Sequence, residues 1–444
     1  MKVKVLVLLL VIALCASLPT QITVANDVSE FDINGLEVIF KKTDGDVIAA
    51  SLFLRGGVTN IDIENQGIER LLFEASLRGS EKYPKDLLNS ELARMGAGIG
   101  VNCGNDYTVI SLRCIDRYFP RSWDIFTDVL IQPTLDEKEV GLVRQQLITR
   151  AKQEKDRPDT YVWDIAETLF FEDHPYALKP GGTEASLANI SLTDLRSYHM
   201  EHMVTSQLLL VIVGNVDPSD LMAKVTQSFG QLPKGHYRAK PLPPPRSSPG
   251  LDMVEQDIPT NYIFGLFSAP SPKSEEYPAM MIATNILSDR VFEEVRTKRN
   301  LAYAVGAGIA SMDSSYGVLY LITAEPNPAM DIVFEEVTKL KQERIDDKTL
   351  QNTVKALITR DYMRNEAVSA QALMLGNWEI VGNGWENYLV FVERLQNVTP
   401  EDVMHVANKY LNNINFGILG DPSKIDIGIF TQISQEAQIT GATS

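Results

Sequence analysis

The sequence predicts an α+β fold of two homologous domains, each an antiparallel sheet packed with helices. Three observations lead to this prediction. A unit of about 210 residues occurs twice, the strand-like stretches of each copy mostly precede its long helix-like stretches, and a proline-rich stretch separates the copies. Strands grouped by hairpins, with helices outside them, favour α+β over an α/β fold, in which strand and helix would alternate strictly.

The duplication is visible in short matching stretches. Residues 147–150, Leu-Ile-Thr-Arg, recur as 357–360, an offset of 210. Residues 190–195 and 398–403 both carry Ser or Thr followed by acidic residues, which is a helix N-terminal signal. In both copies a strand-like stretch that ends in Gly comes later, with Asp-Pro beyond it. We therefore expect one unit that has been duplicated.

Each copy contains the same kinds of elements. In the first copy the patterns predict strands over 36–41, 47–55, 107–112 and 208–214, and helices over 138–155 and 160–171. In the second copy they predict strands over 262–267, 303–310, 317–324 and 416–420, and helices over 330–344 and 348–363. These elements are enough for one sheet and its covering helices in each copy.

The N-terminal residues 1–25 have the pattern of a secretory signal peptide. Lys2 and Lys4 precede an apolar run, and small residues near Ala25 offer a cleavage site. The apolar run, 5–14, is shorter than the roughly 20 residues that a spanning helix needs, which disfavours an uncleaved anchor. We expect an exported protein, with the bacterial periplasm as its compartment and no membrane span after cleavage.

A linker divides the rest of the chain. Residues 234–250 contain five prolines together with Ser and Gly, a composition that is typical of linkers. The predicted domains are therefore 26–233 and 251–444.

Charge and cysteine content narrow the functional classes. The whole sequence carries a net charge of −17, and residues 1–25 contribute two lysines and no acid, so the remainder carries −19. A chain this acidic is a poor partner for nucleic acid. Cys103 and Cys114 lie beyond the signal peptide, across a predicted hairpin, and the sequence leaves their pairing open.

Residues 67–80 resemble the zinc-binding helix of an inverted-motif metallopeptidase from which the metal ligands have been removed. In the working motif, H-x-x-E-H, two histidines on one helix face bind zinc and the glutamate takes a proton from the attacking water. Here Arg70 and Glu74 stand at the histidine positions and Phe73 stands at the glutamate position. This helix cannot hold a catalytic metal by itself, because arginine does not ligate zinc and one carboxylate is too few.

The chain as a whole resembles the pitrilysin/insulinase-type metallopeptidases, a family that includes the mitochondrial processing peptidase and its bacterial relatives. The resemblance rests on motifs in a fixed order in both copies: 54–57, 67–80, 95–114, 173–175, 182–184, 211–217, 290–296 and 300–303. It covers nearly all of the chain after residue 25. It implies a fold in which two domains form half of a four-domain clamshell.

The resemblance also places a third zinc ligand, a glutamate on a later helix, at or beside Arg150. All three ligand positions and the catalytic glutamate are thus lost, at Arg70, Glu74, Arg150 and Phe73. We expect no metal in this chain. Arg70, Glu74 and Arg150 are candidates for an ion pair or triad in place of zinc, which would need good geometry if it were buried.

The second copy retains a functional pair of the family. There, an Arg at a helix end and a Tyr seven residues later, on the next strand, reach the peptide bound at the zinc; Arg296 and Tyr303 keep that spacing. Such donors suit the oxyanion that forms when a peptide carbonyl is hydrated. Without the resemblance, a helix-end Arg and a strand Tyr would be ordinary structural residues.

A glycine-rich stretch in the first copy is a candidate for peptide binding. Gly96, Gly98, Gly100 and Gly104 thin out a strand or bend, which lets another backbone approach. In the family, substrate adds to a sheet edge near this region. A twisted hairpin with bulges is the alternative interpretation.

These observations together predict a zinc-free subunit of a heterodimer. A homologous partner would supply the zinc site, this chain would supply Arg296 and Tyr303, and the complex alone would hydrolyse peptides. The alternative is a catalytically inactive peptide-binding or structural protein of the same fold, in which this pair is dispensable. An independently active hydrolase has little support, since no nucleophile, base and oxyanion-donor constellation can be recognised.

Overall fold

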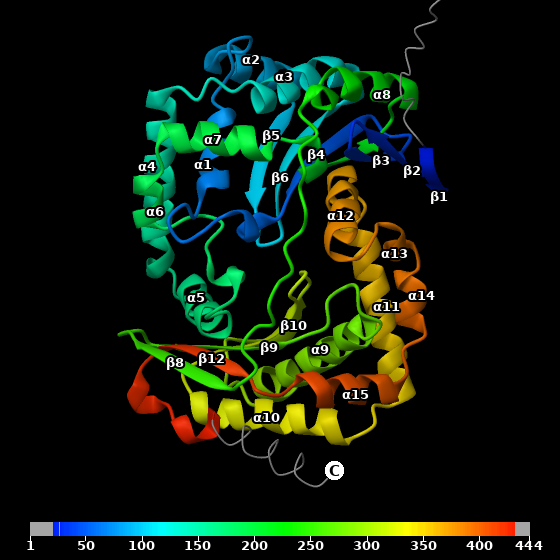
Figure 1. Cartoon of the computed structure of the whole chain (residues 1–444). Helices are drawn as coiled ribbons and strands as arrows, with labels where there is room; N and C mark the ends of the chain where they lie inside the picture. Colours follow the sequence, from blue (N-terminus) through cyan, green and yellow to red (C-terminus); the bar gives the residue numbers. More distant parts are fainter. Residues whose placement is uncertain (1–20, 26, 431–444) are drawn as a thin grey trace, which may run out of the picture.

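The computed structural model describes residues 21–25 and 27–430, which form two sheets with helices around them (Figure 1). The upper sheet in that view belongs to the first copy. Its seven strands follow the spatial order β1 (Gln21–Ala25), β2 (Val28–Ile33), β3 (Leu36–Lys42), β7 (Leu208–Gly214), β4 (Val47–Arg55), β6 (Tyr107–Ile115) and β5 (Gly98–Cys103). Strand β5 is therefore an edge strand, and one of its sides pairs with no strand among the described residues.

The first sheet has two buried faces. Leu208, Leu210 and Ile212 of β7 point to one face, and Leu209, Val211 and Val213 point to the other, as the two-residue period of a strand requires. Most helices of the first copy lie on the first of these faces: α1 (Ile68–Ser76), α2 (Lys85–Met95), α3 (Phe119–Ile131), α4 (Glu137–Gln153), α6 (Glu184–Asn189), α7 (Leu192–His202) and α8 (Pro218–Gln227). A fully apolar β7 is thus explained by packing on both sides.

The second sheet has five strands, in the order β10 (Ala304–Ala310), β11 (Tyr316–Thr323), β9 (Asn261–Ser268), β12 (Asn415–Gly420) and β8 (Gly250–Glu255). Its outer helices are α9 (Tyr277–Val291), which continues into a π-helical segment over Phe292–Thr297, α10 (Pro326–Gln342), α11 (Asp347–Arg364), α13 (Glu386–Leu389), α14 (Phe391–Gln396) and α15 (Pro400–Tyr410). Helices α7 and α15 begin with capping boxes at Ser191 and Thr399, where the duplicated sequence signal lies.

The two sheets share one topology. The order β3-β7-β4-β6-β5 in the first corresponds to β8-β12-β9-β11-β10 in the second. The α+β class predicted from the sequence is confirmed, but the sheets are not purely antiparallel, because β3–β7 and β8–β12 are parallel pairs. In each copy the first strand of this shared set pairs with its last strand, and a parallel pair needs a long connection. No local pattern specifies such a pairing.

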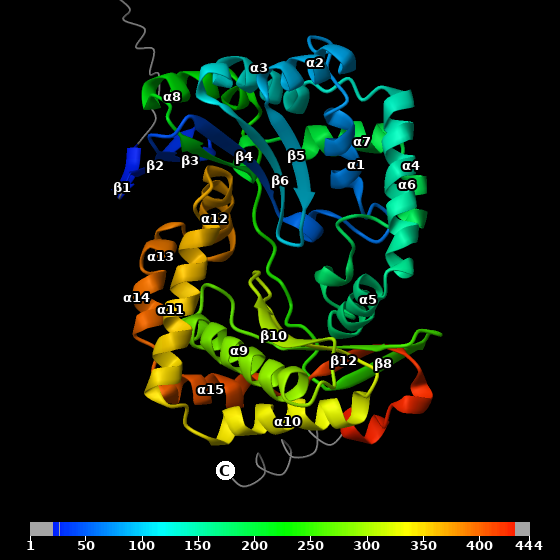
Figure 2. The ribbon, with the colours of Figure 1, turned by 180° about the vertical axis from the view of Figure 1, so that it is seen from behind.

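The copies exchange a helix. Helix α5 (Pro158–Phe170) of the first copy packs on the second sheet, where Ile165 and Ala166 lie among Phe264 and Leu419. Helix α12 (Val368–Val381), the equivalent helix of the second copy, packs on the open face of the first sheet against β4 and β7 (Figures 1 and 2). Each sheet is therefore covered on one face by a helix from the other copy.

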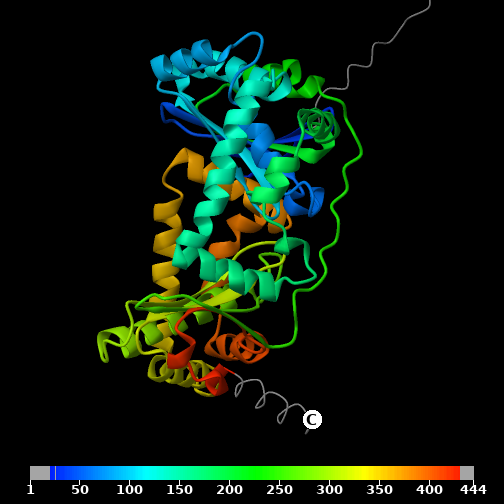
Figure 3. The ribbon, with the colours of Figure 1, turned by 90° about the vertical axis from the view of Figure 1, so that its left-hand side faces the viewer.

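The linker lies along one side of the molecule in Figure 3 and contains no helix or strand between residues 233 and 249. It is attached to the first copy at two points, since Tyr237 N donates to Ser206 Oγ over 3.1 Å and Arg246 N donates to the carbonyl of Phe170, the last residue of α5, over 3.0 Å. Strand β8 starts at Gly250, so the last residue of the predicted linker belongs to the second sheet.

The predicted signal peptide lies mostly outside the described residues. Only its end is described, where Gln21–Ala25 forms β1 and pairs antiparallel with β2. Across residues 21–25 and 27–430, no helix combines the length and the apolar character that crossing a bilayer would take.

Candidate functional site

Helix α1 carries the predicted degenerate zinc motif and is positioned by a close glycine contact. It begins after Gly67, whose φ of +84° is in the left-handed region. A Cβ at Gly67 would lie 2.6 Å from the Cα of Gly182. The start of α1 therefore requires glycine, and the loop before α6 lies against it.

The three residues at the predicted ligand positions form an ion network. Arg70 Nη1 lies 3.5 Å from Glu74 Oε1 on the same helix, and Arg150 Nη1, from α4, lies 3.1 Å from the same oxygen. The side chains of Arg70 and Glu74 are 22% and 17% exposed, and that of Arg150 is 60% exposed. The triad expected from the sequence is thus present, in a partly exposed form that avoids the full desolvation cost of a buried pair.

The residues of this site do not fit a zinc ion. Phe73, at the position of the catalytic glutamate, is fully buried in the core of the first domain. Glu74 pairs with two arginines, and a guanidinium repels a cation and does not ligate it. Within residues 21–25 and 27–430, no three His, Cys, Asp or Glu side chains are grouped as metal ligands would be.

A buried carboxylate beside Arg70 was missed in the sequence. Glu69 is 4% exposed and accepts hydrogen bonds from Tyr198 Oη at 2.6 Å, from Asn60 Nδ2 at 3.1 Å and from the Thr108 hydroxyl. Burial raises the pKa of Glu69, and these three donors oppose the rise. The group anchors α1 to β6 and α7.

Arg296 and Tyr303 lie side by side. The π-helical segment presents Arg296, and the chain turns at Asn300, whose φ is +52°, before Tyr303 N donates to the Ile322 carbonyl over 2.9 Å. The Arg296 guanidinium carbon is 5.8 Å from the centre of the Tyr303 ring and 5.3 Å from that of Phe292. Tyr303 is 76% exposed, so its hydroxyl can reach a bound molecule.

Two of the four glycines, Gly98 and Gly100, lie in edge strand β5, whereas Gly96 caps the end of α2 and Gly104 lies in the turn before β6. Strand β5 pairs with β6 alone, and its other edge carries no strand in the described part of the chain. A Cβ at Gly98 or Gly100 would meet nothing within 4 Å. These glycines are therefore not required by packing, and the space beside them is open.

The two cysteines are free and buried. Cys103 is opposite Thr108 in the β5–β6 pair, and Cys114 is six residues further along β6. At roughly 3.3 Å per residue, this places them about 20 Å apart. No disulfide can join them in this fold.

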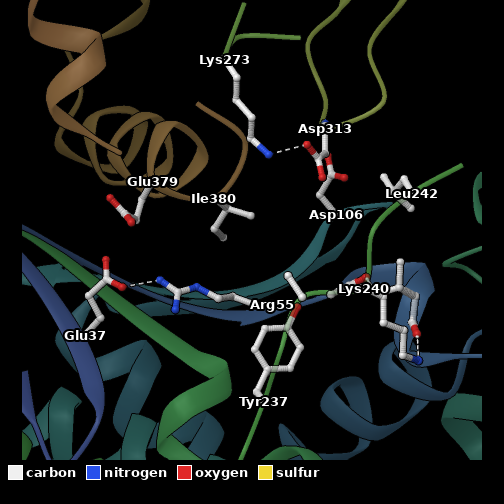
Figure 4. A pocket seen from close by; sticks show the side chains of 13 residues that line it. Glu37, Arg55, Asp106, Tyr237, Lys240, Leu242, Lys273, Asp313, Glu379 and Ile380 are labelled. Carbon is white, nitrogen blue, oxygen red and sulfur yellow. Dashed lines mark hydrogen bonds and ion pairs between the residues drawn. The ribbon is translucent and has the colours of Figure 1, made fainter. Parts of the chain in front are cut away.

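A cavity of about 340 Å³ lies between the two copies and the linker (Figure 4). Glu37 on β3 and Arg55 on β4 form an ion pair in it, and Glu379 of α12 points toward them. Burial and the nearby Glu37 charge raise the pKa of Glu379 to about 7. Sequence reasoning missed this group, because residues from three separate segments meet there.

The hairpin turns of the two copies meet at the same cavity. Asp106, in the β5–β6 turn, accepts a hydrogen bond from the Asp313 main chain at 3.2 Å and one from the Tyr176 hydroxyl. Lys273 Nζ lies 2.6 Å from Asp313 Oδ1. Burial raises the pKa of Asp106 to about 6. These contacts form the seam between the two copies, and charged and hydrogen-bonded side chains line it.

The comparisons with known proteins agree with this architecture. Residues 37–181 match the insulinase family (peptidase family M16), and residues 189–357 match the peptidase M16 inactive domain. The chain belongs to this family. A Rickettsia felis protein described as an uncharacterized zinc protease is 21% identical over 407 residues, covering 88% of this chain and 97% of the relative.

Solved structures give the same fold. A peptidase M16 inactive domain from Pseudomonas fluorescens superposes with a TM-score of 0.81 at 20% identity, covering 89% of this chain and 98% of the other. The periplasmic protease PqqL from Escherichia coli gives a TM-score of 0.77 at 16% identity, covering 90% of this chain and 46% of that protein. An inactive-type domain and the absence of a metal-ligand group among the described residues both fit a chain without zinc.

Proposed function

We propose that this chain is the zinc-free subunit of an exported two-chain metallopeptidase. A homologous partner chain would carry the H-x-x-E-H zinc site. This chain would contribute Arg296 and Tyr303, and peptide hydrolysis would belong to the heterodimer. Alone, the chain would have no peptidase activity.

The observation that carries this proposal is the contrast between the two candidate sites. At the former metal site, Glu74 is held by two arginines and Phe73 is buried in the core. In the second domain, Arg296 and Tyr303 lie together, and the Tyr303 ring is largely exposed. The first site lacks residues that could bind zinc, and the second presents two donors that would act on a peptide bound at the zinc of the partner.

The chemistry of the pair suits transition-state binding. Addition of water to a peptide carbonyl creates negative charge on its oxygen, and a guanidinium and a phenol are both donors to such an oxyanion. Arg296 is oriented by its contacts with Phe292 and Tyr303, so less ordering is needed when the peptide arrives. These two residues would act on the reacting group itself, in trans.

Export to a periplasm belongs to the same proposal. It is supported by the signal-peptide pattern of residues 1–25 and by the likeness in fold to a protease described as periplasmic. A second candidate function, a peptide-binding or assembly protein without any role in hydrolysis, is favoured by the complete loss of the zinc ligands.

A cleavage assay with matched variants separates these two functions. This chain, the zinc-bearing homologue that co-purifies with it, and their mixture are each tested on unfolded peptides. We expect activity in the mixture only. In the mixture, Arg296→Ala should lower kcat by roughly 100-fold, which is typical for loss of one oxyanion donor, and Tyr303→Phe should also lower it.

Two other residues of the second domain supply the controls. Arg299 lies three residues after Arg296 and pairs with Glu294, and Arg299→Ala removes this arginine. Tyr362→Phe removes the hydroxyl of another exposed tyrosine. Both should leave kcat unchanged. A mixture that cleaves no faster than the homologue alone, or that is indifferent to Arg296→Ala, would refute the proposal in favour of a binding protein.

A further inference from the structure

At the former metal site, two arginines share one carboxylate. Arg70 and Arg150 share a single carboxylate, that of Glu74, and both contact its Oε1 atom. The nearby Lys152 of α4 is balanced by Glu184 at 2.8 Å. The nearby carboxylate of Glu69 is buried and accepts its hydrogen bonds from Tyr198, Asn60 and Thr108. Among the described residues, Glu74 is therefore the one carboxylate that contacts these two arginines.

Most of the hydrogen-bonding capacity of these two arginines is unused. A guanidinium has five N–H donors in a planar fork, suited to both oxygens of a carboxylate. Among the described residues, Arg70 makes a single contact at 3.5 Å, at the limit of hydrogen bonding, and Arg150 makes one at 3.1 Å. Glu74 thus satisfies neither guanidinium in the bidentate way.

The site is recessed yet open. The side chain of Arg70 is 22% exposed, so its charge is only partly screened by water, whereas Arg150 is 60% exposed and extends from α4 across the site. A partly desolvated guanidinium attracts an anion more strongly than a fully exposed one does. An incoming carboxylate would contact Arg70 and Arg150 together.

The site lies beside the free edge of the first sheet. Helix α1 packs next to β5, and Arg70 and Glu74 are near enough to Cys103, the last residue of β5, for their charges to act on its thiol. An extended peptide that paired along β5 would gain main-chain hydrogen bonds there. Its end, or a side chain near that end, would lie at Arg70.

We propose that Arg70 and Arg150 form a carboxylate-binding subsite, which selects extended peptides with a C-terminal carboxylate or an acidic side chain at this position. The inference deepens the proposed function and rests on it, since it names the class of peptide that the chain holds. The former metal site would have become an anchor for peptides and would take no part in hydrolysis.

The test measures peptide binding by this chain alone, by fluorescence anisotropy. Three labelled probes of about ten residues share one neutral sequence of Ala, Thr and Ser. One has a free C-terminal carboxylate, one is amidated and carries a single internal Glu, and one is amidated and neutral. We expect the neutral probe to bind at least about tenfold more weakly than one of the other two, and added salt to reduce the difference.

Variants of the ion network should change the affinity for the carboxylate probes in opposite directions. Arg70→Gln and Arg150→Gln should each weaken the binding of the carboxylate probes by about tenfold and leave the binding of the neutral probe unchanged. Glu74→Gln should strengthen the binding of the carboxylate probes, because it removes the carboxylate that competes with them for the two arginines. A merely structural role of the network predicts no such gain. Arg94→Gln, at an exposed α2 arginine paired with Glu91, is the control with an equal change in charge.

The result that overturns the inference is equal binding of all three probes, no binding of any probe, or insensitivity to Arg70→Gln in a protein whose circular dichroism is unchanged. Which probe responds identifies the source of the carboxylate, terminal or side-chain. Failure of the proposed function would be recognised separately, because cleavage by the mixture depends on Arg296 and this binding assay contains no partner.

Discussion

Glu379 illustrates, at the scale of single residues, how the seam between the copies responds to pH. Its carboxylate accepts a hydrogen bond from Trp385 N at 3.0 Å and faces Glu37, whose Oε1 is buried with no hydrogen-bond partner among the described residues (Figure 4). Burial and the Glu37 charge raise the pKa of Glu379 from 4.5 to about 7. The folded state therefore binds a proton that the unfolded state releases between these pH values, and its stability falls as pH rises through this window.

Replacement of Glu379 by glutamine should remove this pH dependence. The amide oxygen keeps the bond from Trp385 N, and the amide nitrogen can donate to Glu37. We expect Glu379→Gln to increase the unfolding free energy at pH 8 by about 1 to 3 kcal/mol, with little change at pH 4.5. Thermal unfolding across this range measures the effect. The exposed Glu366→Gln is the control, and a stabilisation of equal size at both pH values would contradict the assigned cause.

The sequence predicts which single residues stand at lost ligand positions, and it predicts that Arg70, Glu74 and Arg150 pair with one another, as they do in the structure. It does not predict the buried carboxylates nearby. Arg70, Phe73 and Glu74 could be recognised because a motif defines what should stand there. Glu69 could not, because its partners Asn60, Thr108 and Tyr198 lie 9, 39 and 129 residues away and belong to no motif. Glu379 was missed for the same reason. A hydrogen-bond network between residues far apart in sequence produces no local pattern by which it could be predicted.

At the scale of elements, most helices and strands were predictable and their pairing was not. The predicted helices 138–155 and 348–363 correspond to α4 and α11, and the predicted strand 47–55 is β4. These elements have strong local periodicity. The parallel pairs and the exchange of α5 and α12 depend on surfaces far apart in sequence, so no local pattern shows them.

The exchanged helix α12 sets a strict steric requirement where it packs on the first sheet. A Cβ on Gly376 would lie 2.2 Å from the Phe53 ring of β4, which is fully buried. We expect Gly376→Ala to lower the unfolding free energy by about 1 to 3 kcal/mol, because a well-packed core does not accept an added carbon. Chemical denaturation measures the change.

The control for this variant is Gly141 of α4, where an added Cβ would meet nothing within 4 Å. Gly141→Ala should stabilise the protein by up to about 1 kcal/mol, since alanine has the higher helix propensity. If both substitutions stabilised the chain, the contact between Gly376 and the Phe53 ring would be less close than in the structure.

At the scale of the whole molecule, the duplication produces two units that cannot be separated without exposing core. The sequence predicts two domains and a linker, which suggests independent folding. In the structure, α5 covers the second sheet through Val162, Ile165 and Phe170, and α12 covers the first through Ala372 and Leu375. The linker joins the copies covalently, but the exchanged helices bury apolar area in both directions.

Cutting the linker tests this interdependence. A protease site placed at Pro243–Pro245, between the points where Tyr237 and Arg246 are attached, would allow the chain to be cleaved after folding. We expect the two fragments to co-elute in size-exclusion chromatography and to unfold in one transition. Each fragment expressed alone should aggregate, since its exchanged helix and one sheet face would be exposed. Fragments that separate and stay folded would show that the copies are autonomous domains. In that case the linker alone would hold the copies together, and their relative position would not be fixed by packing.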